Sequence, residues 1–142
     1  MGVASVKAQL LSLNQAVKAG GAYSGCKVGL VAGPLVPSKN TVLADIQEPT
    51  YPGYAQQAVT AWTPAYVGGT GIPQADGGDF LFQMTDASTP TTVYGFFLVQ
   101  PAATGPPVVP AYLVETFMFT APQPLATPDD GVSCDVTVLY GD

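Results

Sequence analysis

The residues that most often do chemistry in proteins are scarce in this chain. It has no His and no Arg, so the commonest general base is excluded, and so are the Ser-His and Cys-His nucleophile pairs. Only two glutamates are present, Glu48 and Glu115, and no two acids have a spacing that marks a glycosidase pair. We therefore expect a protein that is not an enzyme and that needs no cofactor.

The remaining candidate motifs favour structural roles. Asp76-Gly-Gly-Asp79 and Asp129-Asp130-Gly131 could offer oxygen ligands to Ca²⁺, but neither matches a recognised calcium loop, and Asp and Gly are the residues that tight turns require. The Gly-rich stretch 68–71 lacks the Lys of a phosphate-binding loop and is interpreted as a linker. The two cysteines, Cys26 and Cys134, do not form a disulfide framework, so we expect free buried thiols and no metal site.

Composition points to a surface that is covered by other subunits. The chain has 142 residues, the usual size of one domain, and 47% of them are hydrophobic while only 10% are charged. A folded monomer of this mass exposes roughly 6,900 Å², which leaves about one charge per 500 Å². The net charge of -6 and the lack of Arg argue against nucleic acid as a partner, and the sequence has no apolar run that could span a membrane.

The charges are separated along the sequence, and the first segment has a helical pattern. All four lysines lie before residue 40, and all ten acids lie from Asp45 onward. The apolar spacing over residues 3–18 predicts an α-helix that ends at Gly20-Gly21. We therefore expect a helical arm over residues 1–21 and a β-sandwich domain over 22–142. The predicted subunit interface on the arm comprises Val3, Val6, Lys7, Leu10, Leu13, Val17 and Lys18.

After the arm, the period of the pattern becomes that of strands. Alternating or continuous apolar segments predict strands over 26–32, 54–63, 79–85, 92–100, 111–120 and 132–140, with a short helical turn over 41–47. Val132, Cys134, Val136, Val138 and Tyr140 are expected to share one face, and the run from Val93 to Val99 is expected to be a central strand. Many short strands with Gly/Pro-rich turns predict a mainly β fold. A jelly-roll-like sandwich and an immunoglobulin-like sandwich fit this pattern equally well.

One part of the chain resembles a known group of proteins. The segment from Thr41 to Ala55, the alternating strand that runs on to Trp62, and the segment Thr92 to Phe97 together resemble a pattern in short virion proteins of tailed bacteriophages. Within that group the chain is most similar to capsid decoration, or cementing, proteins. The resemblance implies a jelly-roll-like domain on the outside of an icosahedral shell, commonly as an oligomer, with no catalytic residues.

Two functional hypotheses follow. In the first, the protein binds the capsid exterior and cements neighbouring major capsid subunits, as a dimer or trimer, in a virion that is assembled in the host cytoplasm. In the second, it is a tail or fibre component whose loops bind a host glycan, for which the loops 64–79 and 101–110 and the many tyrosines are the supporting features. Neither hypothesis involves nucleic acid or a membrane.

Overall fold

A computed structural model describes residues 25–66, 73–85, 89–104 and 106–139, and within them the fold is mainly β. The described residues contain no α-helix, and their one helical element is the 3-10 turn η1 (Leu43–Asp45). The described residues divide into two compact units, one that contains 59–66, 73–79 and 135–139, and the other 26–58, 80–85, 89–104 and 106–134. The expected helical arm, residues 1–21, lies outside the described residues.

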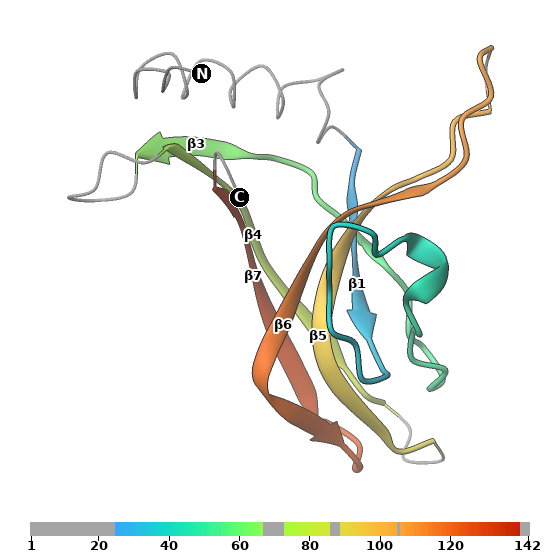
Figure 1. Ribbon diagram of the computed structural model, residues 1–142. Helices are drawn as coiled ribbons and strands as arrows, with labels where there is room; N and C mark the ends of the chain where they lie inside the picture. The colour runs from blue at the N-terminus through green and yellow to red at the C-terminus, as the bar shows by residue number, and fades with distance from the viewer. Residues whose placement is uncertain (1–24, 67–72, 86–88, 105, 140–142) are drawn as a thin grey trace. The chain divides into compact units, whose positions relative to one another are not determined.

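The strands form two antiparallel sheets (Figure 1). The four-stranded sheet has the order β2-β1-β5-β6, and the three-stranded sheet has the order β3-β4-β7. The strands are β1 (Lys27–Val31), β2 (Gln57–Ala58), β3 (Thr63–Tyr66), β4 (Pro73–Gln83), β5 (Thr91–Gln100), β6 (Tyr112–Leu125) and β7 (Gly131–Leu139). The mainly β class expected from the sequence is therefore confirmed.

Strand β5 occupies the centre of the four-stranded sheet, as its continuous apolar sequence predicts. It pairs with β1 on one side, where Phe97 lies opposite Gly29, and with β6 on the other, where Phe96 lies opposite Phe117. Residues 95–99 are all buried. A Cβ atom on Gly29 would lie 2.5 Å from Cζ of Phe97, so only glycine allows this ring to cross β1.

The loop between β1 and β2 covers part of this four-stranded sheet. Val31, Phe97 and Val99 form a buried cluster against which partly buried side chains pack: Leu35, Leu43, Ile46, Tyr94, Ala111, Leu113 and Met118. The first three come from the loop and from η1, whose start is fixed by a hydrogen bond from the Val42 N–H to Oδ2 of Asp45 at 2.9 Å. The helical turn expected over 41–47 is therefore present, although its helical part is limited to three residues.

Strands β4 and β7 show the expected alternation. Val132, Cys134, Val136 and Val138 are buried while Ser133 and Asp135 are exposed, and Phe82 and Met84 of the β4 segment are buried while Leu81 and Gln83 are exposed. Tyr140 lies outside the described residues. The prediction of a loop up to Asp79 was wrong, because β4 begins at Pro73.

Candidate interaction surface

The connection between β5 and β6 is an apolar hairpin, which we define as residues 101–112. It continues the two strands through an isolated bridge in which Ala103 and Val109 exchange backbone hydrogen bonds of 2.8 and 3.1 Å. Pro101, Pro106, Pro107 and Pro110 restrict its backbone. In Figure 1 it is the orange arm that extends beyond the paired strands β5 and β6. The sequence therefore builds a stiff projection rather than a tight turn.

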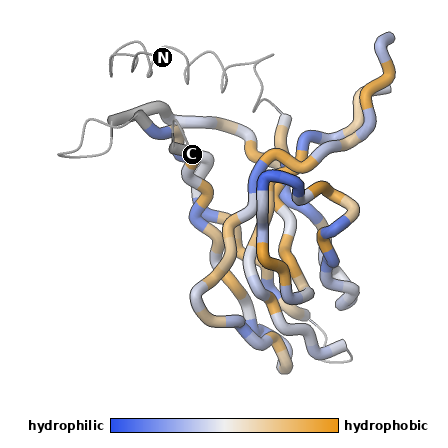
Figure 2. The backbone as a smooth tube through the Cα atoms, in the orientation of Figure 1, coloured by the Kyte–Doolittle hydropathy of each residue, from blue (hydrophilic) through white to orange (hydrophobic). Residues whose placement is uncertain are grey.

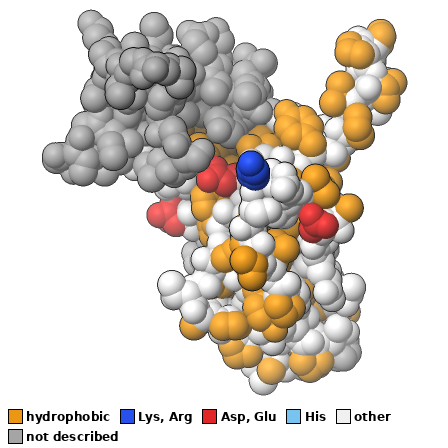
Figure 3. All heavy atoms as spheres, in the orientation of Figure 1, with side chains coloured by type: hydrophobic (Ala, Val, Ile, Leu, Met, Phe, Trp, Pro, Cys, Tyr) orange, Lys and Arg blue, Asp and Glu red, His pale blue; other side chains and the backbone are white. Residues whose placement is uncertain are grey.

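The hairpin exposes apolar side chains to solvent. Val108 is 77% exposed, Tyr112 46% and Val109 38%. Not one charged residue occurs between Asp86 and Glu115, so the whole hairpin lies in an uncharged part of the sequence. Figures 2 and 3 show hydrophobic residues along this arm, and the arm carries neither red nor blue side chains in Figure 3. Such a surface can make contact with another protein without desolvating a charge.

The segment from Thr41 to Ala55 has a structural role in the fold. Tyr51-Pro-Gly-Tyr54 forms a turn with a 3.2 Å hydrogen bond from the Tyr54 N–H to the Tyr51 carbonyl, and Gly53 has a φ of +86°. Pro at the second position and a positive φ at the third are the marks of a type II turn. This turn directs the Tyr54 side chain toward β1.

Tyr54 then connects this segment to β1. Its hydroxyl accepts a hydrogen bond from the Leu30 N–H at 2.9 Å and donates one to Oε1 of Glu48 at 2.7 Å. Gln56 Nε2 also donates to the same carboxylate oxygen, at 3.0 Å. Burial raises the pKa of Tyr54 well above its usual range; the Leu30 hydrogen bond opposes this, and the Glu48 carboxylate adds to it. The phenol therefore stays protonated and keeps its donor role. We call these four residues the Tyr54 latch.

The acidic motifs act as turns. Asp76 Oδ1 accepts a hydrogen bond from the Gly78 N–H at 2.9 Å, and Gly78 has a φ of +98°. Asp130 Oδ2 accepts hydrogen bonds from the N–H groups of Ala126 and Thr127, both at 2.9 Å, and these bonds lower the pKa of its carboxyl group. In the described part of the chain no three His, Cys, Asp or Glu residues cluster in a way that could hold a metal ion.

Both cysteines are free and buried, as the sequence predicts. The Cys26 thiol donates a 3.3 Å hydrogen bond to Oε1 of Gln100. Burial raises the pKa of Cys26 to about 11 and that of Cys134 to about 12, so neither is a reactive thiolate at neutral pH.

The interface predicted on the helical arm falls outside the part of the chain that the structure describes. Val3, Val6, Lys7, Leu10, Leu13, Val17 and Lys18 all lie outside the described residues. The hairpin, by contrast, was interpreted in the sequence as a Pro-rich connection and, in the glycan hypothesis, as the loop 101–110. The signal that could have identified it is the long uncharged run from residue 87 to 114.

Comparisons with known proteins identify no relative. The chain matches no protein-family model, no curated protein and no solved structure. None of the helical structure in the described ranges is long and apolar enough to cross a membrane.

Proposed function

We propose that this protein is a structural component of a tailed-phage virion that binds the outside of the icosahedral capsid and cements neighbouring major capsid subunits. The observation that carries the proposal is the apolar hairpin, which presents Val108 and Val109 on an arm without charges. The proposal includes a jelly-roll-like sandwich for the domain, which is supported by its two antiparallel sheets. Self-association as a dimer or trimer is part of the same proposal.

The chemistry of the hairpin suits a permanent contact. Fully burying a valine side chain contributes about 1.5–3 kcal/mol, and the exposed Val108 can gain most of this when it enters a pocket on a capsid subunit. The four prolines of the hairpin reduce the conformational entropy that binding must remove. A protein that binds the assembled shell and not the free subunits stabilises the shell by mass action.

The experiment is cosedimentation of the purified full chain with empty, undecorated shells of the phage whose genome encodes it. We compare the wild type with Val108→Asp and with a matched control, Val36→Asp. Val36 is 93% exposed but lies outside the hairpin, so both variants place one new carboxylate on an exposed valine. We expect the wild type and V36D to cosediment with shells, and V108D to bind at least about tenfold more weakly.

Two results would overturn the proposal. If the wild-type protein stays in the supernatant at every shell concentration, the protein does not decorate capsids. If V108D binds as tightly as V36D, the hairpin is not the contact and the observation that carries the proposal is lost.

A further inference from the structure

The sequence contains two Asp-Gly pairs, Asp76-Gly77 and Asp130-Gly131. In such a pair the Gly nitrogen can attack the Asp side chain, because glycine has no Cβ to hinder the approach. The nitrogen bonds to Cγ of Asp, and the N–H proton leaves with the carboxyl hydroxyl group as water, which closes a succinimide ring. Water then opens the ring at either carbonyl and gives aspartate or isoaspartate. The two pairs share this chemistry, but their surroundings in the fold differ.

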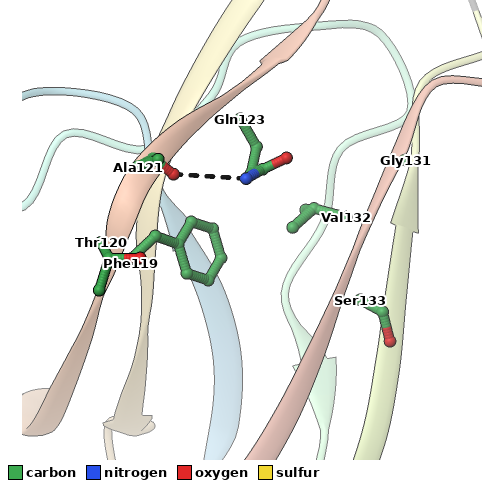
Figure 4. Close-up of a pocket in the computed structure, with 7 residues that line it drawn as sticks. All are labelled: Phe119, Thr120, Ala121, Gln123, Gly131, Val132 and Ser133. Carbon is green, nitrogen blue, oxygen red and sulfur yellow. Dashed lines mark hydrogen bonds between the residues drawn. The ribbon is translucent and has the colours of Figure 1, made fainter.

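The Asp130 carboxyl group faces the residues that precede it. Its Oδ2 accepts hydrogen bonds from the N–H groups of Ala126 and Thr127, both at 2.9 Å. The Asp130 backbone carbonyl accepts a 2.8 Å hydrogen bond from the Met84 N–H, which fixes the peptide unit that leads to Gly131. Gly131 is the first residue of β7 and lines the groove between β6 and β7 that Figure 4 shows. Ring closure at Asp130 therefore has to break several contacts of the fold.

The Asp76 carboxyl group faces the residues that follow it. Its Oδ1 accepts a 2.9 Å hydrogen bond from the Gly78 N–H, so the carboxyl group is turned toward the chain that contains the Gly77 nitrogen. Asp76 is exposed, and the pairing of β3 with β4 reaches its last pair there, with Thr63 opposite. The φ of +98° at Gly78 shows that the backbone then leaves regular extended geometry. The side chain is therefore already directed toward the nitrogen that attacks it.

We propose that Asp76 is a site of spontaneous isomerisation to isoaspartate in the folded protein, and that the fold protects Asp130 from the same reaction. The lowered pKa of Asp130 acts in the same direction, because ring closure proceeds from the neutral carboxyl group. The inference stands on residues outside the apolar hairpin and does not depend on capsid binding.

Isomerisation at Asp76 would disturb a close contact. A Cβ on Gly77 would lie 3.1 Å from Cζ3 of Trp62 and 3.1 Å from Cγ1 of Val59, so both side chains pack closely on this glycine. Isoaspartate adds one methylene group to the backbone directly beside this contact. Trp62 is the only tryptophan of the chain, so its fluorescence reports on the change. We expect the isomerised fraction to show a shifted Trp62 emission.

The test is a prolonged incubation of the purified full chain at neutral pH, folded in one sample and unfolded in guanidinium in the other. Isoaspartate is located by methyl transfer with an isoaspartyl methyltransferase, followed by digestion and mass spectrometry. Ring closure at Asp130 has to break hydrogen bonds of the fold, so we expect it to be at least about fivefold slower than at Asp76 in the folded sample. In the unfolded sample the two Asp-Gly pairs should react at similar rates.

Substitutions then test the assignment to Asp76. Asp76→Glu lengthens the side chain by one methylene group, which disfavours ring closure, so isoaspartate at this position and the change in Trp62 emission should both be lost. The matched control is Asp79→Glu, the same change at an exposed acid of β4 that precedes Phe80 and not a glycine. D79E should form isoaspartate at Asp76 as fast as the wild type does. Far-UV circular dichroism shows whether each variant is folded.

The proposal is wrong if the folded protein forms isoaspartate at Asp130 as fast as at Asp76. It is also wrong if the folded protein forms none at Asp76 while the unfolded chain does, because the fold then protects both sites. Isoaspartate in folded D76E at the level found in D79E would show that the modified residue is not Asp76.

Discussion

Removal of one hydroxyl group from the Tyr54 latch should measurably destabilise the domain. Tyr54→Phe deletes the acceptor of the Leu30 N–H and the donor to Glu48 while it keeps the ring in place. An unpaired buried N–H costs about 1–3 kcal/mol, and a lost hydrogen bond to a charged group costs a similar amount. Because Gln56 still donates to Glu48, we take the lower part of the summed range and expect a loss of about 2–3 kcal/mol.

The assay is urea unfolding together with a thermal melt. For a chain of this length, each kcal/mol of lost stability lowers the Tm by about 3 °C, so the Tm should fall by about 6–9 °C. Tyr112→Phe is the control, because it makes the same chemical change at a residue that is 46% exposed, and we expect it to cost less than about 0.5 kcal/mol. If Y54F and Y112F unfold at the same urea concentration, the latch does not hold the loop to β1 and the reasoning fails.

Two further predictions concern ionisable groups. The pKa of Asp130 is lowered by its backbone hydrogen bonds, so its contribution to stability is present above its unfolded pKa, near 4, and is lost as the pH falls through the folded value. The Tm difference between the wild type and Asp130→Asn should therefore be largest at neutral pH and vanish in acid; a difference that stays constant with pH would contradict this. Cys26 and Cys134 should resist iodoacetamide at pH 8 in the native protein and react in guanidinium, as followed by mass spectrometry. Because burial raises the pKa of both thiols, their contribution to stability is complete below about pH 9 and is lost as the pH rises toward 11 and 12. If the native protein is alkylated as fast as the unfolded protein, the two thiols are not buried.

The parts of the fold that follow from local periodicity could be predicted from the sequence. The alternation in β7 and the continuous apolar run in β5 predict which side chains are buried, and the burial seen in the structure agrees with both patterns. The mainly β class and the buried thiols follow from the same kind of information.

Strand ends were predicted less well, and each error has a physical reason. β6 was expected to end at residue 120, but it continues to Leu125 through Pro122 and Pro124. Proline is tolerated there because β6 is the last strand in the order of its sheet and its outer edge needs no N–H for pairing. β4 begins six residues before the predicted start of the strand. The hydrogen bond from the Gly78 N–H to Asp76 and the positive φ of Gly78 allow the Gly-Gly pair to lie within the strand.

The apolar hairpin could not be predicted from local pattern. The irregular pairing, in which four residues of β6 lie opposite one residue of β5, could not be predicted either, because register is set by pairing between distant segments. The hairpin depends on β5 and β6 continuing as a pair beyond the sheet through the Ala103–Val109 bridge. Composition showed that charge is missing from this region, but it could not show that the region projects.

The Tyr54 latch also bears on the resemblance to virion proteins that was proposed from the sequence. Glu48 and Tyr54 of the latch, together with Tyr51, whose ring contacts that of Tyr54, are used within the fold, where they fix a loop and a turn against β1. A similar motif in another protein therefore argues for a similar way of building this corner of the domain. The proposed attachment to a capsid needs a surface that is not already packed within the fold, and the exposed, uncharged hairpin is such a surface. A variant that breaks the latch should accordingly lose stability first and binding only as a consequence, whereas V108D should lose binding while its Tm is unchanged.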